Sequence, residues 1–113
     1  MSELGEAQAV ASLAALAQET RLRLFKRLLQ AEPVGLTPGE LAAEFGLAGA
    51  TLSFHLKELS AAGLVSAARQ GRHIQYRVNM AGMNGLMDYL TAQCCGGQPC
   101  GVACEPICSA TGP

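Results

Sequence analysis

The chain has 113 residues, of which 50% are hydrophobic, 15% charged and 4% aromatic, and its formal net charge is −1. This length predicts one small globular domain and excludes a large multidomain enzyme. No window approaches the roughly 18 consecutive apolar residues of a membrane-spanning helix. No basic stretch precedes an apolar run at the N-terminus, so we expect a cytoplasmic chain without a secretory signal. Because so small a core is marginal alone, we also expect association with a second chain.

The first half of the chain predicts three helices. Residues 4–17 are rich in Ala and Leu, and a second helical run spans residues 19–31, where a following proline ends it. A short third helix is expected over residues 38–45. Thr37 can cap its first turn, a proline fits its first position, and Gly46 can end it.

A fourth helix and a hairpin follow. Residues 50–62 carry one apolar stripe at helical spacing, and Gly63 is placed to cap the end. The period then changes to that of strands over residues 64–69 and 73–78, with a glycine-containing turn at 70–72. The stripe consists of Leu52, Leu56 and Leu59.

Asn79 is expected to cap a last helix that ends near Gln93 or Cys94. The chain beyond it is rich in Gly, Pro, Cys and Ser and has no periodicity. We therefore divide the chain into a folded domain, residues 1–93, and a cysteine-rich tail, residues 94–113.

The order of the predicted elements is two short helices joined by a tight turn, then a hairpin, then a closing helix. This order predicts a mainly α (α+β) winged helix-turn-helix of about five helices with a two-stranded wing. The charges are unevenly distributed, with four basic residues and no acid in 21–27, and a balance of +3 over 51–78. This pattern fits a protein that touches phosphate with one face, although an ordinary solvated face would show the same charges.

Several segments together resemble the ArsR/SmtB metal- and metalloid-responsive repressors over about residues 8–92. They are TLSFHLKEL at 51–59, AGLV at 62–65, RQGR at 69–72, Tyr76, and ETRLRL at 19–24. The resemblance implies a homodimeric repressor, paired through its first and last helices. It would bind an imperfect inverted repeat in double-stranded operator DNA and leave it when an inducer binds.

The resemblance also implies which residues meet the DNA. Four on the fourth helix would face bases and backbone, and two arginines would lie on the wing. His55 lies close to the buried side of its helix, so we expect it to be packed or capping and not to read bases. The implied contact residues are Thr51, Ser53, Phe54, Lys57, Arg69 and Arg72.

All the cysteines lie in the last twenty residues. A secreted disulfide framework would distribute them across the fold, whereas an odd number crowded into one tail points to reduced thiols that bind something soft. The five are Cys94, Cys95, Cys100, Cys104 and Cys108.

The sequence departs from two inducer sites of the family. Residues 39–45 lack the cysteines of one arsenic site, and the last helix offers only Asp88 toward a zinc-type site, with the two histidines elsewhere. What remains resembles the arsenite sensors of the family that carry an adjacent cysteine pair at the helix end and a third cysteine a few residues later.

Trivalent arsenic or antimony is soft and binds three thiolates, and no organic cofactor is indicated. We assign Cys94 and Cys95 as ligands, with Cys100 as the third and Cys104 as its alternative, leaving Cys108 spare. Gly residues directly after the pair let the chain curl back. We hypothesise that binding reshapes the end of the last helix and changes the separation of the two DNA-reading heads.

Other interpretations of the tail remain open. Two thiols alone could bind methylated arsenite, two cysteines could sense oxidants or persulfide by forming a disulfide, or four could hold a structural zinc. An enzyme such as a small thiol reductase is not favoured, because no Cys-x-x-Cys follows a strand and no cofactor loop is visible.

Overall fold

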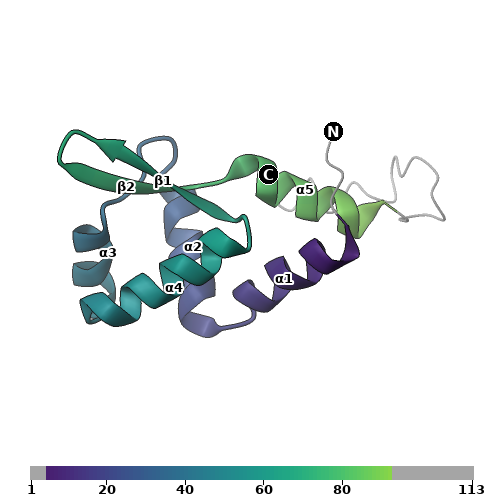
Figure 1. Cartoon of the computed structure of the whole chain (residues 1–113), viewed down its shortest axis with the longest axis horizontal. Helices are drawn as coiled ribbons and strands as arrows, with labels where there is room; N and C mark the ends of the chain where they lie inside the picture. The colour runs from purple at the N-terminus through teal and green to yellow at the C-terminus, as the bar shows by residue number, and fades with distance from the viewer. Residues whose placement is uncertain (1–4, 93–113) are drawn as a thin grey trace, which may run out of the picture.

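The computed structural model of the chain describes residues 5–92. Within this range the predicted winged helix-turn-helix is confirmed, with five helices and a two-stranded antiparallel hairpin. In Figure 1 the hairpin and α3 lie at one end of the molecule, and α1 and α5 lie at the other. The elements are α1 (Glu6–Leu16), α2 (Glu19–Gln30), α3 (Pro38–Phe45), α4 (Gly49–Ala61), β1 (Val65–Gln70), β2 (His73–Val78) and α5 (Met80–Thr91).

The short helix α3 is fixed at both ends by the expected residues. The Thr37 hydroxyl accepts a hydrogen bond from the Glu40 N–H at 3.1 Å, and the Glu40 carboxylate accepts one from the Thr37 N–H at 2.9 Å. This capping box satisfies two N–H groups that the first turn leaves free. At the other end Gly46 adopts the left-handed conformation with φ 63°, so the chain turns sharply into α4.

Replacing Thr37 with alanine is expected to lower the free energy of unfolding by about 1 kcal/mol, because the Glu40 N–H loses its acceptor. Urea denaturation at fixed protein concentration should show a lower midpoint with an unchanged slope. Thr37→Ser is the matched control, since its hydroxyl can take over the hydrogen bond, and it should keep most of the stability. An equal loss in both variants would contradict the capping argument.

The end of α4 is also as expected. Gly63 has φ 79°, its N–H donates to the Ser60 carbonyl at 2.9 Å, and the Leu64 N–H donates to the Leu59 carbonyl at 3.0 Å. These two bonds form the Schellman arrangement that ends many helices at a glycine. It aims the chain directly from α4 into β1.

Several element boundaries differ slightly from the prediction: α1, α2 and α4 each end one residue earlier than expected, and β1 spans residues 65–70 where 64–69 was expected. α4 begins at Gly49, one residue before the expected Ala50. α5 begins after Asn79, whose side chain accepts from the Gly82 N–H as expected, but it ends at Thr91 and not at Gln93 or Cys94. The Ala92 N–H donates to the carbonyl three residues back, which tightens and closes the last turn.

The core is formed mainly by leucines from α2, α3 and α4. The predicted stripe of α4 is confirmed, since Leu52, Leu56 and Leu59 are at most 2% exposed. Leu41 of α3 is fully buried against them. Burial of these side chains is the main force that holds the two helices together, because so short a helix as α3 is marginal alone.

The wing is joined to the helices by a contact that the sequence did not predict. β1 and β2 pair in register from Val65 opposite Val78 to Gln70 opposite His73. Leu36, expected only as part of an extended link, forms an additional antiparallel bridge with Tyr76 through hydrogen bonds of 3.0 and 2.7 Å. The hairpin is thereby anchored to the segment that enters α3.

Residues 62–64 form a junction where α1, α4 and α5 meet. The Ala62 carbonyl accepts from the Gln8 amide at 2.8 Å and from the Ser12 hydroxyl at 3.1 Å. The Gly63 carbonyl accepts from the Asn79 amide at 2.9 Å. The first and last helices are therefore tied to the same turn at the end of α4. Among residues 5–92, no helix is both long and apolar enough to cross a membrane.

Candidate nucleic-acid interface

The helices α3 and α4 form a helix-turn-helix. Residues 46–48 make the turn, in which the Leu47 N–H donates to the Ala42 carbonyl at 3.1 Å. In this motif the second helix enters the major groove and presents its exposed face to the bases. α4 is therefore the candidate recognition helix, held in place by the buried stripe on its opposite side.

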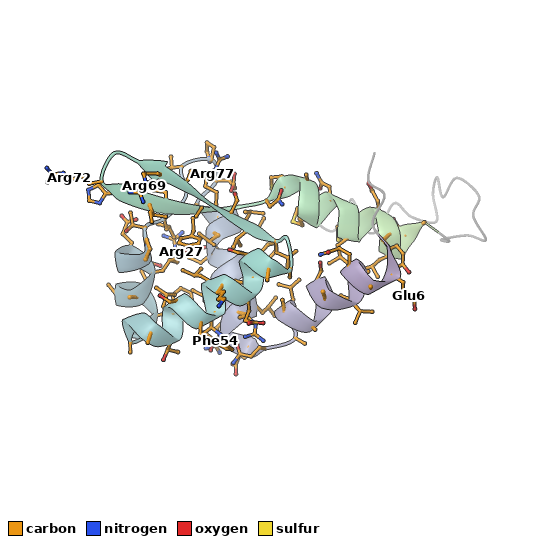
Figure 2. The ribbon with its side chains drawn as sticks, in the orientation of Figure 1. Glu6, Arg27, Phe54, Arg69, Arg72 and Arg77 are labelled. Carbon is orange, nitrogen blue, oxygen red and sulfur yellow. The ribbon has the colours of Figure 1, made fainter. Side chains whose placement is uncertain are left out.

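The predicted DNA-facing residues of α4 are all exposed. Phe54, with 54% of its surface accessible, lies opposite the buried stripe at the outer edge of the helix (Figure 2). Two hydroxyl groups and one cation complete the predicted set, and all three are exposed: Thr51, Ser53 and Lys57. Their exposure leaves them free to contact DNA, and the contact itself stays a prediction.

The two wing arginines are exposed as well. Gly71 has φ 64° and makes the tight turn between the strands. Figure 2 shows Arg72 at the tip of the hairpin, pointing away from the body of the protein, with Arg69 further back on the wing. An arginine at such a tip can reach a phosphate or the minor groove beside the recognition helix.

The basic segment 21–27 does not form a free phosphate-binding face. Arg23 pairs with Glu19 one helical turn away, and Arg27 pairs with Glu44 of α3. On the wing, Arg77 pairs with Glu32 at 3.1 Å. Among the residues that the structure describes, the cations without such an ion pair are Arg21, Lys26, Lys57, Arg69 and Arg72. Three of these five are predicted DNA contacts.

The pair between Arg27 and Glu44 links α2 to α3. Its two hydrogen bonds measure 2.8 and 3.1 Å, so the contact is bidentate. The bond from Arg27 lowers the pKa of the Glu44 carboxyl and raises the pKa of the guanidinium. Because the Arg27 and Glu44 side chains are 33% and 41% exposed, solvent screens the pair, and it orients the two helices more than it stabilises them.

Arg21 has an internal role that the sequence did not indicate. Its Nε donates to the Ala15 carbonyl at the end of α1 at 2.8 Å, and its Nη1 donates to the Nδ1 of His55 at 3.3 Å. His55 is only 8% exposed, which confirms that it packs inside the protein. Burial lowers the pKa of the His55 imidazole, and the positive charge of Arg21 lowers it further. A neutral His55 is the form that can accept this bond.

Acidification from pH 7 to pH 5 is expected to destabilise the protein through His55. Because the folded-state pKa of this imidazole is depressed, the unfolded chain takes up the proton first as the pH falls. The contribution of neutral His55 to the free energy of unfolding is complete above the pKa of about 6.5 that histidine has in the unfolded chain, and it is lost as the pH falls through the folded-state pKa. One proton limits the slope to about 1.4 kcal/mol per pH unit.

Urea denaturation across this pH range tests the assignment. His55→Gln should flatten the pH dependence, whereas His73→Gln, on the exposed wing, should retain it. Glu44 does not interfere, because a carboxyl with a lowered pKa loses its contribution only at more acidic pH. A slope that survives in His55→Gln would assign the effect to another group.

A protein-family model described as a helix-turn-helix domain matches residues 16–66. The HTH-type transcriptional regulator CmtR of Mycobacterium tuberculosis is 42% identical over 62 residues, 55% of this chain and 50% of CmtR, so the chain spans about half the length of that relative. The transcriptional activator HlyU of Vibrio cholerae is 32% identical over 88 residues, which cover 78% of this chain and 79% of HlyU.

Solved structures are similar across most of the fold. An ArsR-like transcriptional regulator from Rhodococcus sp. RHA1 matches with a TM-score of 0.68 and 26% identity, over 92% of this chain and 89% of that one. A possible transcriptional regulator for arsenical resistance matches with a TM-score of 0.61 and 33% identity, over 70% and 79%. This chain belongs to the ArsR family of transcriptional regulators. The family consists of regulators and not of enzymes.

In this ArsR-family chain, α1 and α5 pack against each other and expose apolar side chains. Val10 and Leu13 of α1 are 58% and 43% exposed, and Met87 and Leu90 of α5 are 43% and 52% exposed. Apolar side chains gathered on neighbouring helices are typical of a surface that another chain covers. They lie on the two helices through which we expect the homodimer to pair.

The predicted inducer ligands of this ArsR-family chain lie outside the described residues. Within residues 5–92, no group of three or more His, Cys, Asp or Glu side chains is placed to hold a metal ion. The Ala92 cap of α5 is two residues from the first cysteine. The assignment of the ligands therefore remains a prediction for Cys94, Cys95 and Cys100, with Cys104 as the alternative third ligand, and the same holds for the boundary between residues 1–93 and 94–113.

Proposed function

We propose that this chain is a homodimeric repressor that binds double-stranded operator DNA and releases it when As(III) or Sb(III) binds its C-terminal cysteines. The observation that carries the DNA-binding part is the exposed face of α4. This face combines hydroxyl groups, one aromatic ring and Lys57, and the wing adds Arg69 and Arg72. None of these three cations forms an ion pair with the described residues. Positive charge without an internal partner is available for phosphate.

The proposed dimer supplies two such heads. Its contact would form where the exposed apolar residues of α1 and α5 lie. Because the junction at residues 62–64 ties both helices to the end of α4, a change in either dimer helix would move the recognition helix as well. The cysteines follow α5 directly, so binding of an inducer there would act on the dimer contact and, through this junction, on the reading heads.

The inducer is proposed from the chemistry of the tail. Thiolates select soft ions, and trivalent arsenic or antimony takes three of them. Cys94, Cys95 and Cys100 would supply them, and Cys104 could replace Cys100. The similarity to the solved protein described as a possible regulator for arsenical resistance supports the same inducer class.

Fluorescence anisotropy of the reduced protein on DNA from upstream of its own coding sequence tests the proposal. Arsenite should release the wild-type protein, and Cys94→Ser and Cys95→Ser should bind DNA normally but resist release. Cys100→Ser and Cys104→Ser identify the third ligand, and Cys108→Ser is the matched control that should respond as wild type does. A wild-type protein that stays bound through saturating arsenite would contradict the inducer assignment.

A second candidate function is a DNA-binding regulator of the same fold that responds to oxidation of its cysteines and not to arsenite. One solved structure similar to this chain is of HlyU in its reduced form, with a TM-score of 0.59 and 30% identity. In this case oxidant alone, without arsenite, would release the DNA, and a thiol reductant would restore binding. HlyU is named an activator, so a reporter gene placed behind the same upstream DNA would distinguish repression from activation.

A further inference from the structure

Phe54 is an unusual residue on the exposed face of α4. Apart from this ring, the exposed residues of the helix are small, hydroxyl-bearing or charged. Phe54 lies on the opposite side of α4 from the core, and it belongs to neither α1 nor α5, the helices that carry the expected dimer contact. Neither core packing nor that contact explains why an aromatic side chain with 54% exposure occupies the centre of a candidate recognition face.

Arg21 holds this ring in place. Its guanidinium carbon lies 6.0 Å from the centroid of the Phe54 ring, a distance at which a cation is attracted to an aromatic face. The guanidinium is itself fixed by hydrogen bonds to Ala15 and His55. The His55 ring also contacts Phe54, tilted at 60° with 5.6 Å between the ring centroids.

This arrangement prepares Phe54 for contact with an apolar partner. A ring that is already oriented loses little conformational entropy when it binds. Because Phe has no hydrogen-bonding group, it cannot read the donors and acceptors of the base edges. Among the groups that base pairs present in the major groove, the apolar one is the 5-methyl group of thymine.

We propose that Phe54 selects thymine through its 5-methyl group and that Arg21 is a positioning residue that orients the ring without touching DNA. This inference rests on the proposed function, since it requires α4 to enter the major groove. It adds one base feature that the protein would recognise, the 5-methyl group of thymine. It also gives Arg21 a role other than the phosphate contact that the charge pattern suggests.

Uracil tests the proposal because it differs from thymine only by lacking the methyl group. The upstream DNA fragment is prepared once with thymine and once with uracil throughout, and anisotropy measures the affinity of each. The wild-type protein should prefer the thymine duplex by about fourfold per half-site, or roughly 15-fold for two. Phe54→Ala should lose most of this preference, and Phe54→Leu should keep part of it.

Because every variant is measured on the same two duplexes, comparing the preference for thymine between variants cancels any effect of uracil on DNA shape. Arg21→Lys keeps the charge but loses the fixed geometry, so it should reduce the preference for thymine without changing the salt dependence of binding. Arg23→Lys, a neighbouring exposed arginine on α2, is the matched control and should change neither quantity.

The outcomes separate this inference from the proposed function. If the wild-type protein does not bind the thymine duplex, the proposed function fails. If it binds but Phe54→Ala keeps the full preference for thymine, the inference on Phe54 is overturned, and the exposed ring has another partner, such as a protein. A weaker salt dependence in Arg21→Lys would show that Arg21 contacts phosphate and would overturn its role as a positioning residue.

Discussion

Gly82→Ala is expected to destabilise the folded chain by about 3 kcal/mol, a large part of the stability of so small a domain. A Cβ at this position would lie 1.9 Å from the carbonyl oxygen of Gly63 and 3.1 Å from its carbonyl carbon. Neither atom can move independently, because Gly63 belongs to the turn that ends α4. The added methyl group must therefore push α5 away from α4.

The displacement would also break hydrogen bonds. The Gly63 carbonyl accepts from the Asn79 amide, and the Asn79 N–H donates to the Leu64 carbonyl at 2.8 Å. Both bonds hold the first turn of α5 against the junction. Alanine is the better helix former by about 1 kcal/mol, so the expected loss is what remains after this gain.

Gly39→Ala is the matched control. Gly39 also lies in a helix, and the nearest atom to an added Cβ is the Thr37 hydroxyl at 3.9 Å. This variant should be neutral or slightly more stable. Urea denaturation of both variants at the same protein concentration measures the difference, since any dimer makes stability depend on concentration. Equal stability of Gly82→Ala and the wild type would mean that α5 does not pack closely on the Gly63 turn.

The sequence was sufficient for the features that depend on neighbouring residues. Thr37 with its capping box, the glycines that end α3 and α4, and the Asn79 cap all act within a few positions of the chain. The leucine stripe of α4 is likewise a local pattern with a single period. These signals together were enough to predict the winged helix-turn-helix and the exposed face of α4.

The contacts that the sequence did not predict join residues far apart in the chain. The bridge of Leu36 to Tyr76, the bond of Arg21 to His55 and the approach of Gly82 to Gly63 have no periodic signal. A glycine in a helix could have suggested close packing, but nothing in the sequence identifies its partner.

The sequence showed where basic residues cluster along the chain, but it did not show which of them remain unpaired on the surface of the protein. The cluster at 21–27 suggested a phosphate-binding face, but Arg27 finds its partner 17 residues away on another helix. Only the pair of Glu19 and Arg23, four residues apart on one helix, could have been recognised beforehand. The cysteine ligands depend on the tail beyond residue 92, so their assignment still rests on thiol chemistry and on the family resemblance.

Neutralising the unpaired cations of the proposed interface should weaken DNA binding more than any other surface change. The triple variant Lys57→Gln, Arg69→Gln, Arg72→Gln removes six positive charges from a dimer. If each contacts one phosphate, the slope of log K against log salt should decrease in magnitude by about 5. The affinity at 100 mM salt should fall by at least a thousandfold on the order-of-magnitude estimate from released counterions.

A second triple variant, Arg23→Gln, Lys26→Gln, Arg77→Gln, removes the same number of exposed positive charges. In this control, two of the three arginine or lysine side chains already pair with carboxylates, and none lies on the exposed face of α4 or at the tip of the wing. The salt slope should therefore change little, although the lost net charge will weaken binding somewhat through the overall field. If both variants lose the same slope, binding depends on total charge, and the wing and α4 do not form a specific interface. If only the first variant loses it, the three cations contact phosphate, and the paired arginines serve the fold.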